Sequence, residues 1–233
     1  MVLEILYAVI AGLSDIFGGW LGFKTRISSI MPRYIIGFAA GLLLSLTFVE
    51  ILPEINVQLQ GAVVASGFFV FYIIEKLTML HACGEDECTV HKLSGITVAG
   101  MALDNIVDGV GIAVGYLTNP LLGLVITLGV VVHEIPQGIT SVVVMKHAGY
   151  SKKKTYLILF VAAALYPIGA LVSSFIPKGV YESVLAFVAG GFLYIGASDL
   201  LPEAHKKFNK FVILSVLLGI AFVLLLGPVF HAI

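Results

Sequence analysis

Charged residues are scarce in this chain, and what is missing already narrows its class. Asp, Glu, Lys and Arg make up 12% of its 233 residues, about half of the roughly 25% found in soluble globular domains. The 13 basic and 14 acidic residues nearly cancel, so the sequence lacks the basic excess of a nucleic-acid-binding protein. Two cysteines are too few for a disulfide-built secreted module. These shortages exclude an ordinary soluble domain, a disordered chain and a nucleic-acid partner.

Apolar residues are correspondingly abundant. Apolar residues make up 59% of the chain, and about 20 of them in succession cross a bilayer as a helix. We therefore expect an all-α membrane protein, a single polytopic transmembrane domain over residues 1–233 that crosses the lipid bilayer eight times. The expected spans are residues 2–23, 34–53, 60–80, 94–117, 120–145, 154–176, 180–201 and 210–231.

Basic residues lie almost entirely on one set of alternate connections between these spans. Twelve of the 13 Lys and Arg residues fall there, and Lys178 falls on the other set. Because cytoplasmic loops are enriched in Lys and Arg, the sequence predicts that these twelve are cytoplasmic and that both termini lie outside, with the plasma membrane as the default location. The twelve are Lys24, Arg26, Arg33, Lys76, Lys92, Lys146, Lys152, Lys153, Lys154, Lys206, Lys207 and Lys210.

Two segments far apart in the chain resemble each other. Residues 38–54 read FAAGLLLSLTFVEILPE, and residues 187–203 read FVAGGFLYIGASDLLPE. At this offset of 149, Glu50 matches Asp199 and both segments end in Leu-Pro-Glu. They belong to spans 2 and 7, which run in opposite directions, so the similarity indicates an inverted repeat of spans 1–3 and 6–8 around the central pair 4–5. Chance likeness of apolar helices is the alternative.

Carboxylates lie near the middle of the two central spans. Asp104, Asp108 and Glu134 are expected at mid-depth, where each charge costs about 2.5–3.5 kcal/mol on insertion scales. No Lys or Arg lies at a matching depth in any expected span. Protonation, a water-filled path or a bound cation remain as ways to accommodate the three groups.

Helix geometry favours the cation. Asp104 and Asp108 are four residues apart and share one helix face, and His133 and Gln137 repeat this spacing in the next span. Carboxylate, imidazole and amide ligands together suit a divalent first-row metal such as Zn²⁺, Fe²⁺ or Mn²⁺. A structural role for the polar residues is the alternative. The candidate metal ligands are Asp104, Asn105, Asp108, His133, Glu134 and Gln137.

Further candidates lie closer to the membrane surfaces. Glu50 and Asp199, near the ends of spans 2 and 7, are candidate ligands where an ion enters or leaves the membrane, or else interfacial residues. Asp15 in span 1 has no evident partner and receives no role. The connection at residues 81–93, expected on the cytoplasmic side, is a candidate tetrahedral zinc site or else a solvated loop. Its candidate ligands are His81, Cys83, Cys88 and His91.

These motifs resemble the ZIP (Zrt/Irt-like) family of divalent metal transporters. Residues 133–136, His-Glu-Ile-Pro, look like the His-Glu-x-Pro signature of its LIV-1 subfamily, and residues 104–109, Asp-Asn-Ile-Val-Asp-Gly, are similar to the family's His-Asn-x-x-Asp-Gly. The resemblance implies a transporter and no enzyme, with Zn²⁺ as transported substrate rather than cofactor. It also implies uptake toward the cytoplasm and an elevator-like motion of spans 1, 4, 5 and 6.

The sequence departs from this family at three points. Asp104 stands where the family usually has His, Gln137 stands where His or Glu is common, and span 6 has no acidic residue. A carboxylate in place of an imidazole makes the site harder, which favours Fe²⁺ or Mn²⁺. The oligomeric state, monomer or homodimer, stays open.

Two other functions remain as alternatives. The carboxylates could serve as a relay in a proton-linked carrier of an organic solute. An intramembrane metallohydrolase is less favoured, because Gln137 replaces the second His of a His-Glu-x-x-His zinc motif.

Overall fold

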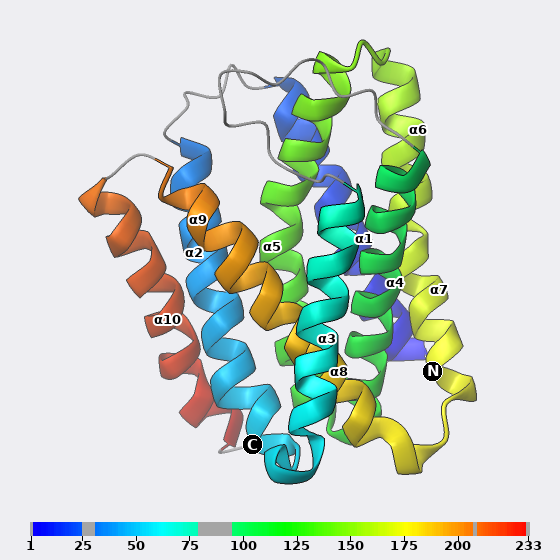
Figure 1. Ribbon diagram of the computed structural model, residues 1–233, viewed down its shortest axis with the longest axis vertical. Helices are drawn as coiled ribbons and strands as arrows, with labels where there is room; N and C mark the ends of the chain where they lie inside the picture. Colours follow the sequence, from blue (N-terminus) through cyan, green and yellow to red (C-terminus); the bar gives the residue numbers. More distant parts are fainter. Residues whose placement is uncertain (1, 25–30, 79–94, 207–208, 232–233) are drawn as a thin grey trace.

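Every regular element of the described structure is helical. The computed structural model describes residues 2–24, 31–78, 95–206 and 209–231 (Figure 1), and within them it confirms the all-α class. The label η marks 3-10 and π-helical segments. In chain order the elements are α1 (Val2–Lys24), α2 (Met31–Leu46), η1 (Thr47–Ile51), η2 (Leu52–Glu54), α3 (Val57–Thr78), α4 (Gly95–Thr118), α5 (Pro120–His147), α6 (Lys152–Ala163), α7 (Leu165–Val172), η3 (Ser173–Phe175), η4 (Lys178–Val180), α8 (Tyr181–Tyr194), η5 (Ile195–Leu200), α9 (Leu201–Ala204) and α10 (Lys210–His231).

These elements join into eight rods. Seven segments of the described chain are long and apolar enough to cross a membrane, and α4, with 24 residues, forms the eighth rod. Three of the seven consist of consecutive pieces: α2 continues into η1 and η2, α6 into α7 and η3, and η4 into α8, η5 and α9. The eight predicted spans agree with this bundle.

The helix boundaries follow ordinary capping chemistry. The side chain of Asn119 accepts a hydrogen bond from the Leu121 N–H at 3.0 Å, and Pro120 takes the first position of α5, where no N–H is needed. Ser151 caps α6 in the same way, by accepting from the Lys154 N–H at 3.3 Å. These caps separate α4 from α5 and α5 from α6 with short connections.

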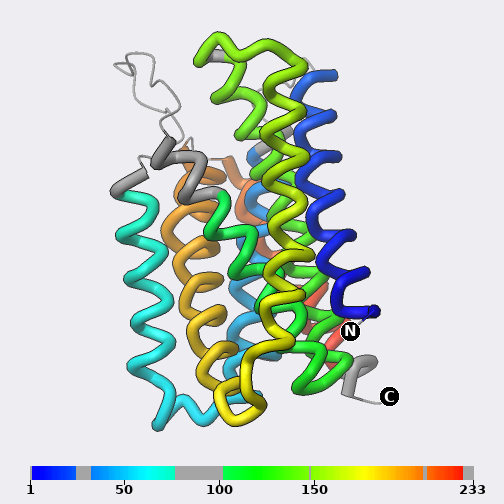
Figure 2. The backbone as a smooth tube through the Cα atoms, turned by 90° about the vertical axis from the view of Figure 1, so that its right-hand side faces the viewer, coloured from blue at the N-terminus to red at the C-terminus, as the bar shows by residue number. Residues whose placement is uncertain are grey.

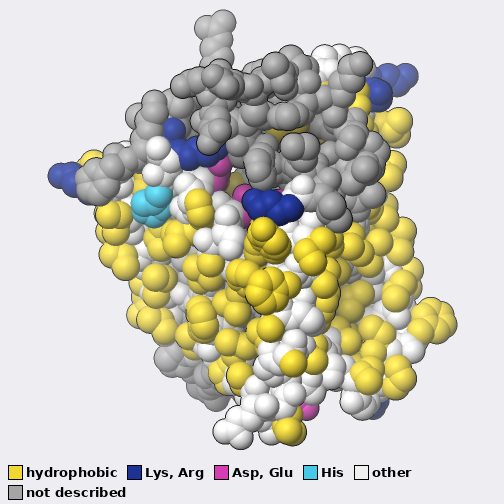
Figure 3. Space-filling view, in the orientation of Figure 1, with side chains coloured by type: hydrophobic (Ala, Val, Ile, Leu, Met, Phe, Trp, Pro, Cys, Tyr) yellow, Lys and Arg dark blue, Asp and Glu magenta, His cyan; other side chains and the backbone are white. Residues whose placement is uncertain are grey.

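The outer surface of the bundle is apolar. Large hydrophobic side chains point outward along the rods, among them Leu225, which is 75% exposed, and Phe160, which is 58% exposed. In Figure 3 such side chains cover the middle of the visible face, and Lys and Arg lie mainly toward its upper margin. A surface of this kind matches lipid chains rather than water. The chain is therefore an integral, multi-pass membrane protein.

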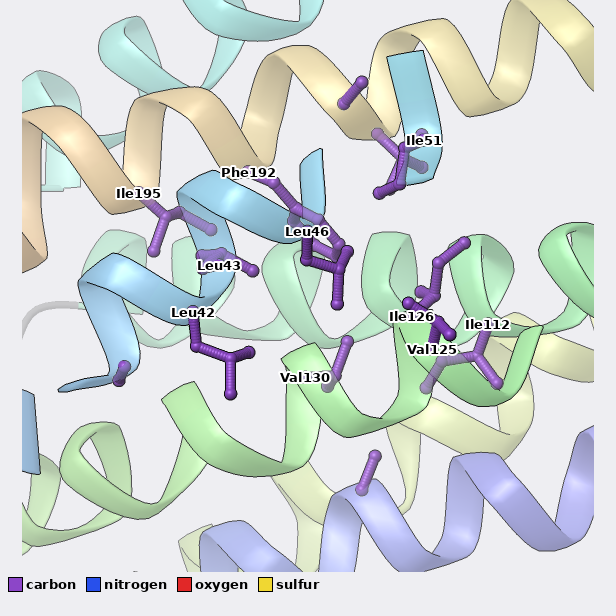
Figure 4. Packing of buried hydrophobic residues seen from close by; sticks show 14 of the residues in the cluster. Leu42, Leu43, Leu46, Ile51, Ile112, Val125, Ile126, Val130, Phe192 and Ile195 are labelled. Atoms are coloured by element: carbon purple, nitrogen blue, oxygen red, sulfur yellow. The ribbon is translucent and has the colours of Figure 1, made fainter. Parts of the chain in front are cut away.

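The central rods are α4 and α5, and most of the other rods contact one or both of them. α1 packs along α5, and α7 packs along α4 (Figures 1 and 2). α2 pairs with α10, and α3 pairs with α8. Buried apolar side chains fill the space between α2, α5 and α8, with Leu46, Val130 and Phe192 among them (Figure 4).

Glycine contacts between rods follow the inverted repeat. A Cβ on Gly41 of α2 would strike the Val216 carbonyl of α10, and a Cβ on Gly190 of α8 would strike the Val64 carbonyl of α3. Gly41 and Gly190 are equivalent at the offset of 149, so the pair α2–α10 repeats as the pair α8–α3. In Figure 1, α2 and α8 run in opposite vertical directions, as an inverted repeat requires.

Each repeat also contains a π-helical segment at the same place, which the sequence analysis did not anticipate. η1 ends two residues before Pro53, and η5 ends two residues before Pro202. The N–H of Leu52 bonds to the carbonyl five residues back, and the N–H of Leu201 does the same. Proline lacks an N–H and crowds the preceding turn, which accounts for the altered bonding.

Candidate metal centre

Three fully buried side chains from α4 and α5 converge on one point. His133 Nε2 lies 3.4 Å from Asp108 Oδ2 and 3.1 Å from Glu134 Oε1, and all three side chains are 0% exposed. One ligand atom from each residue lies within 4.8 Å of the other two. We refer to Asp108, His133 and Glu134 as the central cluster.

A backbone hydrogen bond orients the imidazole of the central cluster. His133 Nδ1 lies 3.0 Å from the Gly129 carbonyl oxygen. A carbonyl only accepts, so Nδ1 carries a proton and donates it. In the neutral ring, Nε2 therefore presents its lone pair to the two carboxylates, which is the arrangement of a metal-ligating histidine.

The central cluster lacks hydrogen-bond donors. Among the described residues, both oxygens of Asp108, both oxygens of Glu134 and the Nε2 of His133 are buried without a hydrogen-bond partner. Buried polar atoms are normally satisfied, so this group of acceptors calls for an explanation. A proton on Nε2 would balance one carboxylate and leave the other. A divalent cation between the three side chains would satisfy all of them.

The other three predicted ligands surround the central cluster without entering it. Gln137 Nε2 donates to Asp104 Oδ2 at 3.3 Å, so these two side chains pair across α5 and α4. Asn105 Nδ2 donates to the Ala162 carbonyl of α6 at 3.0 Å. Asp104 Oδ1 and Asn105 Oδ1 stay buried without a hydrogen-bond partner among the described residues. Asn105 thus joins α4 to α6 and keeps one free oxygen.

Close helix contacts hold α4 and α5 in place. A Cβ on Gly109 would strike the Tyr166 carbonyl of α7, and a Cβ on Gly138 would strike the Asp15 carbonyl of α1. Both glycines therefore allow close approach of an outer helix, α7 to α4 and α1 to α5. α1 and α7 also contact each other, so together they pack against the two motif-bearing helices.

The candidates near the membrane surfaces lie apart from the central cluster. Glu50, in η1, is buried, and Asp199, in η5, is exposed. The described group of residues close enough to share an ion includes neither of them. Asp199 interacts electrostatically with Glu75 of α3, a residue that was not singled out from the sequence. Tyr194 of α8 donates its hydroxyl to Glu75.

The candidate loop ligands His81, Cys83, Cys88 and His91 lie outside the described residues. The structure therefore adds nothing to the prediction for residues 81–93.

Eight apolar rods around a buried set of acceptors define the class: a polytopic membrane protein with a candidate cation site between its central helices. The family described as ZIP Zinc transporter matches residues 81–227. This match covers more than half of the chain, and the chain belongs to the ZIP zinc transporter family.

Individual relatives agree with this assignment. The chain is 26% identical over 197 residues to zinc transporter ZIP13 of Pongo abelii, a match that covers 75% of this chain and 59% of that protein. It is 26% identical over 241 residues to zinc transporter ZupT of Chlorobium limicola, with 90% and 91% covered. It is 30% identical over 133 residues to zipt-7.2 of Caenorhabditis elegans, with 54% and 29% covered. The chain thus spans about three fifths of the ZIP13 length and nearly all of the ZupT length.

Proposed function

We propose that this protein transports divalent transition-metal ions across a membrane through the central cluster. The observation that supports it most is the meeting of three buried acceptor groups, Asp108, His133 and Glu134, with no donor between them. A metal ion binds to neutral imidazole and to ionised carboxylates, and this site contains one imidazole and two carboxylates. The relatives' names favour Zn²⁺ as the substrate.

The proposal divides the six predicted ligands into two groups. The central cluster binds the ion directly. Asp104, Asn105 and Gln137 supply neighbouring oxygens and hold α4, α5 and α6 in register. The site contains one nitrogen and several oxygens, so it accepts Fe²⁺ and Mn²⁺ as well as Zn²⁺.

The proposed path of the ion through the membrane is based on the inverted repeat. Glu50 and Asp199 occupy equivalent positions in η1 and η5, one in each half of the protein. We assign them as ligands where the ion enters and leaves the membrane. Alternating access of the central site to the two faces is the usual use of such repeats, with net uptake toward the cytoplasm.

The orientation belongs to the same proposal. The helix ends that carry most basic residues form the cytoplasmic side of a plasma-membrane protein, and both termini lie outside.

The whole chain, residues 1–233, acts as one transmembrane domain. Its loop at residues 81–93 captures the ion after transit. A homodimer is the alternative to a monomer, and cross-linking in the membrane distinguishes the two.

Uptake by purified protein in liposomes tests the proposal. We expect uptake of Zn²⁺ and a loss of at least tenfold in its rate for Asp108→Ala and for His133→Ala, because each change removes a direct ligand. Glu54→Gln is the matched control, since Glu54 is an exposed carboxylate in η2 and should leave the rate unchanged. Parallel assays with Fe²⁺, Mn²⁺ and Cd²⁺ give the selectivity. Unaltered uptake by both cluster variants would refute the proposal.

A further inference from the structure

Lysines of three helices gather at one end of the bundle, although α1 is far from α5 and α6 in the chain. Lys24 ends α1, Lys146 lies in the last turn of α5, and the others occupy the first turn of α6, at the same end of the molecule in Figures 1 and 2. All of these side chains are exposed. We refer to them as the lysine patch: Lys24, Lys146, Lys152, Lys153 and Lys154.

One aromatic ring shows how closely the three helix ends approach. Two lysines lie over Phe23 of α1: Lys146 Nζ is 5.3 Å and Lys152 Nζ is 5.5 Å from the centre of its ring, within the range of cation–π attraction. The same ring packs on Tyr156 of α6, with the two centroids 5.0 Å apart. Lys146 Nζ also donates to the Gly22 carbonyl of α1 at 3.5 Å. Lysines of α5 and α6 are therefore held together on one residue of α1.

No carboxylate balances the lysine patch in the described part of the chain. Two lysines of other helix ends differ in this respect: Lys76 Nζ lies 3.5 Å from Glu75, and Lys206 Nζ lies 2.6 Å from Glu203. None of the patch lysines forms such an ion pair among the described residues. α6 contains no acidic residue, and those of α1 and α5 lie at least nine residues from the patch lysines of the same helix. The positive charge of the patch thus calls for a partner from outside these helices.

The lysine patch borders the surface that faces lipid. Trp20 of α1 is 41% exposed and lies one turn before Lys24, whose Nζ is 4.4 Å from the centre of the indole ring. Phe17, which stacks on Trp20, and Leu157 of α6 continue the exposed apolar surface toward the middle of the bundle. Tryptophan followed by lysine is typical of the level where acyl chains give way to polar headgroups. The ammonium groups of the patch therefore lie at the depth of lipid phosphates.

Anionic phospholipid fits this combination of charge and apolar surface. Its phosphate accepts hydrogen bonds from lysine ammonium groups, and its acyl chains match the exposed apolar side chains next to the patch. A soluble anion would use the charge alone, and in a zwitterionic lipid an ammonium group offsets the phosphate. Four to eight basic residues beside a membrane span are a recurrent binding site for anionic lipid.

We propose that the lysine patch binds the headgroups of phospholipids with a net negative charge and so links the ends of α1, α5 and α6 at the membrane surface. α5 carries His133 and Glu134 of the central cluster, and α1 packs along α5. Bound anionic lipid thus stabilises the packing of helices that position the central cluster. The binding itself requires no metal, so the proposal does not depend on the proposed function.

Quenching of Trp20 by brominated lipids tests the proposal. Trp20 is the only tryptophan of the chain and lies at the lysine patch, so its fluorescence reports which lipids are in contact there. The purified full chain is placed in phosphatidylcholine bilayers that contain an equal fraction of either brominated phosphatidylglycerol or brominated phosphatidylcholine. We expect an association constant about three- to tenfold higher for the anionic lipid. In about 1 M NaCl, where charges are screened beyond about 3 Å, this ratio should fall toward one.

Two double variants show whether the preference arises at the lysine patch. Lys146→Gln with Lys152→Gln removes the two ammonium groups over the Phe23 ring and should lower the ratio at least about twofold. Lys76→Gln with Lys206→Gln is the matched control. It removes the same charge from two lysines that already pair with carboxylates, and it should keep the ratio. Circular dichroism verifies that both variants fold, and the salt series on the unsubstituted chain tests the proposal without any substitution.

The outcomes of these measurements are distinct. A preference for phosphatidylglycerol that salt weakens and that only the patch variant loses would support the proposal. Equal quenching by the two lipids, or a preference that both double variants retain, would overturn it. Sodium phosphate in place of sodium chloride at equal ionic strength separates lipid from free phosphate. A larger loss of the preference in phosphate would assign the patch to soluble phosphate groups and would also overturn the proposal.

Discussion

Glu134 is held in an arrangement that favours metal binding over stability. Its carboxylate faces the lone pair of His133 Nε2 at 3.1 Å, and neither oxygen has a donor within the described structure. Acceptors forced together without a donor or a cation destabilise the empty protein. The first prediction concerns this destabilisation of the metal-free protein.

We expect Glu134→Gln to stabilise the metal-free protein by about 1–3 kcal/mol, because the amide N–H can donate to His133 Nε2 and one buried charge disappears. The same change should abolish most of the increase in Tm that Zn²⁺ produces. Thermal unfolding with and without Zn²⁺ measures both effects. Glu182→Gln is the control: Glu182 Oε1 already accepts from the Asn56 N–H at 2.6 Å, so this variant should gain no stability and keep its metal response. A lower metal-free Tm for Glu134→Gln would contradict the account.

The second prediction at the residue scale concerns how the affinity for Zn²⁺ depends on pH. Protons compete with the metal for His133 Nε2 and for the two carboxylates, so the affinity for Zn²⁺ should fall as the pH falls. Binding at pH 7.5 and 5.5 should differ by about tenfold or more in Kd, with the weaker binding at the lower pH. An affinity that does not change between these values would mean that the ligands of the ion are other groups.

Residue types and spacing predicted much of this site, but not its internal division. The spacing placed His133 and Gln137 on one face of α5, and the structure shows that Gln137 donates to Asp104 instead of joining the central cluster. Asn105 turns its amide toward α6. Such choices depend on how α4 and α5 rotate against their neighbours, which no local pattern encodes. Glu75 was missed for the same reason.

At the scale of elements, glycine contacts determine how close α1 comes to α5. A Cβ on Gly138 would strike the backbone carbonyl of Asp15, and backbone cannot move aside as a flexible side chain can. The third prediction is that Gly138→Ala separates the two helices, destabilises the protein by about 1–3 kcal/mol and weakens Zn²⁺ binding.

Gly61→Ala is the matched control for this prediction. Gly61 lies in α3, and a Cβ there would meet nothing within 4 Å. Because alanine is the better helix former, this variant should stabilise the protein by about 0.5–1 kcal/mol and leave metal binding unchanged. Thermal unfolding and binding of both variants give the comparison. Equal effects of the two changes would argue against close α1–α5 packing as the cause.

At the scale of elements, the sequence predicted the inverted repeat but not the π-helical segments. The match of Glu50 with Asp199 predicted the repeat, and the paired glycine contacts agree with it. The π-helical segments η1 and η5 were not predicted, because apolar periodicity does not separate one extra residue per turn from a regular α-helix. Proline two residues after each segment is the signal that could have indicated them.

At the scale of the whole molecule, the distribution of basic residues sets the orientation. The fourth prediction concerns two exposed positions at opposite ends of the bundle, Lys178 in η4 and Lys153 at the start of α6. In a variant whose native cysteines are replaced by serine, Lys178→Cys should react with a membrane-impermeant thiol reagent on intact cells. Lys153→Cys should react only after the cells are permeabilised. The reverse pattern would invert the proposed orientation and the direction of uptake.

The central claim is that a dication binds between Asp108, His133 and Glu134. Anomalous diffraction at the zinc absorption edge, from crystals of the full chain grown with Zn²⁺, tests it most directly. The account predicts a peak about 2.0–2.2 Å from His133 Nε2 and from carboxylate oxygens of Asp108 and Glu134. Zinc peaks confined to other places, with these three side chains free of metal, would contradict it.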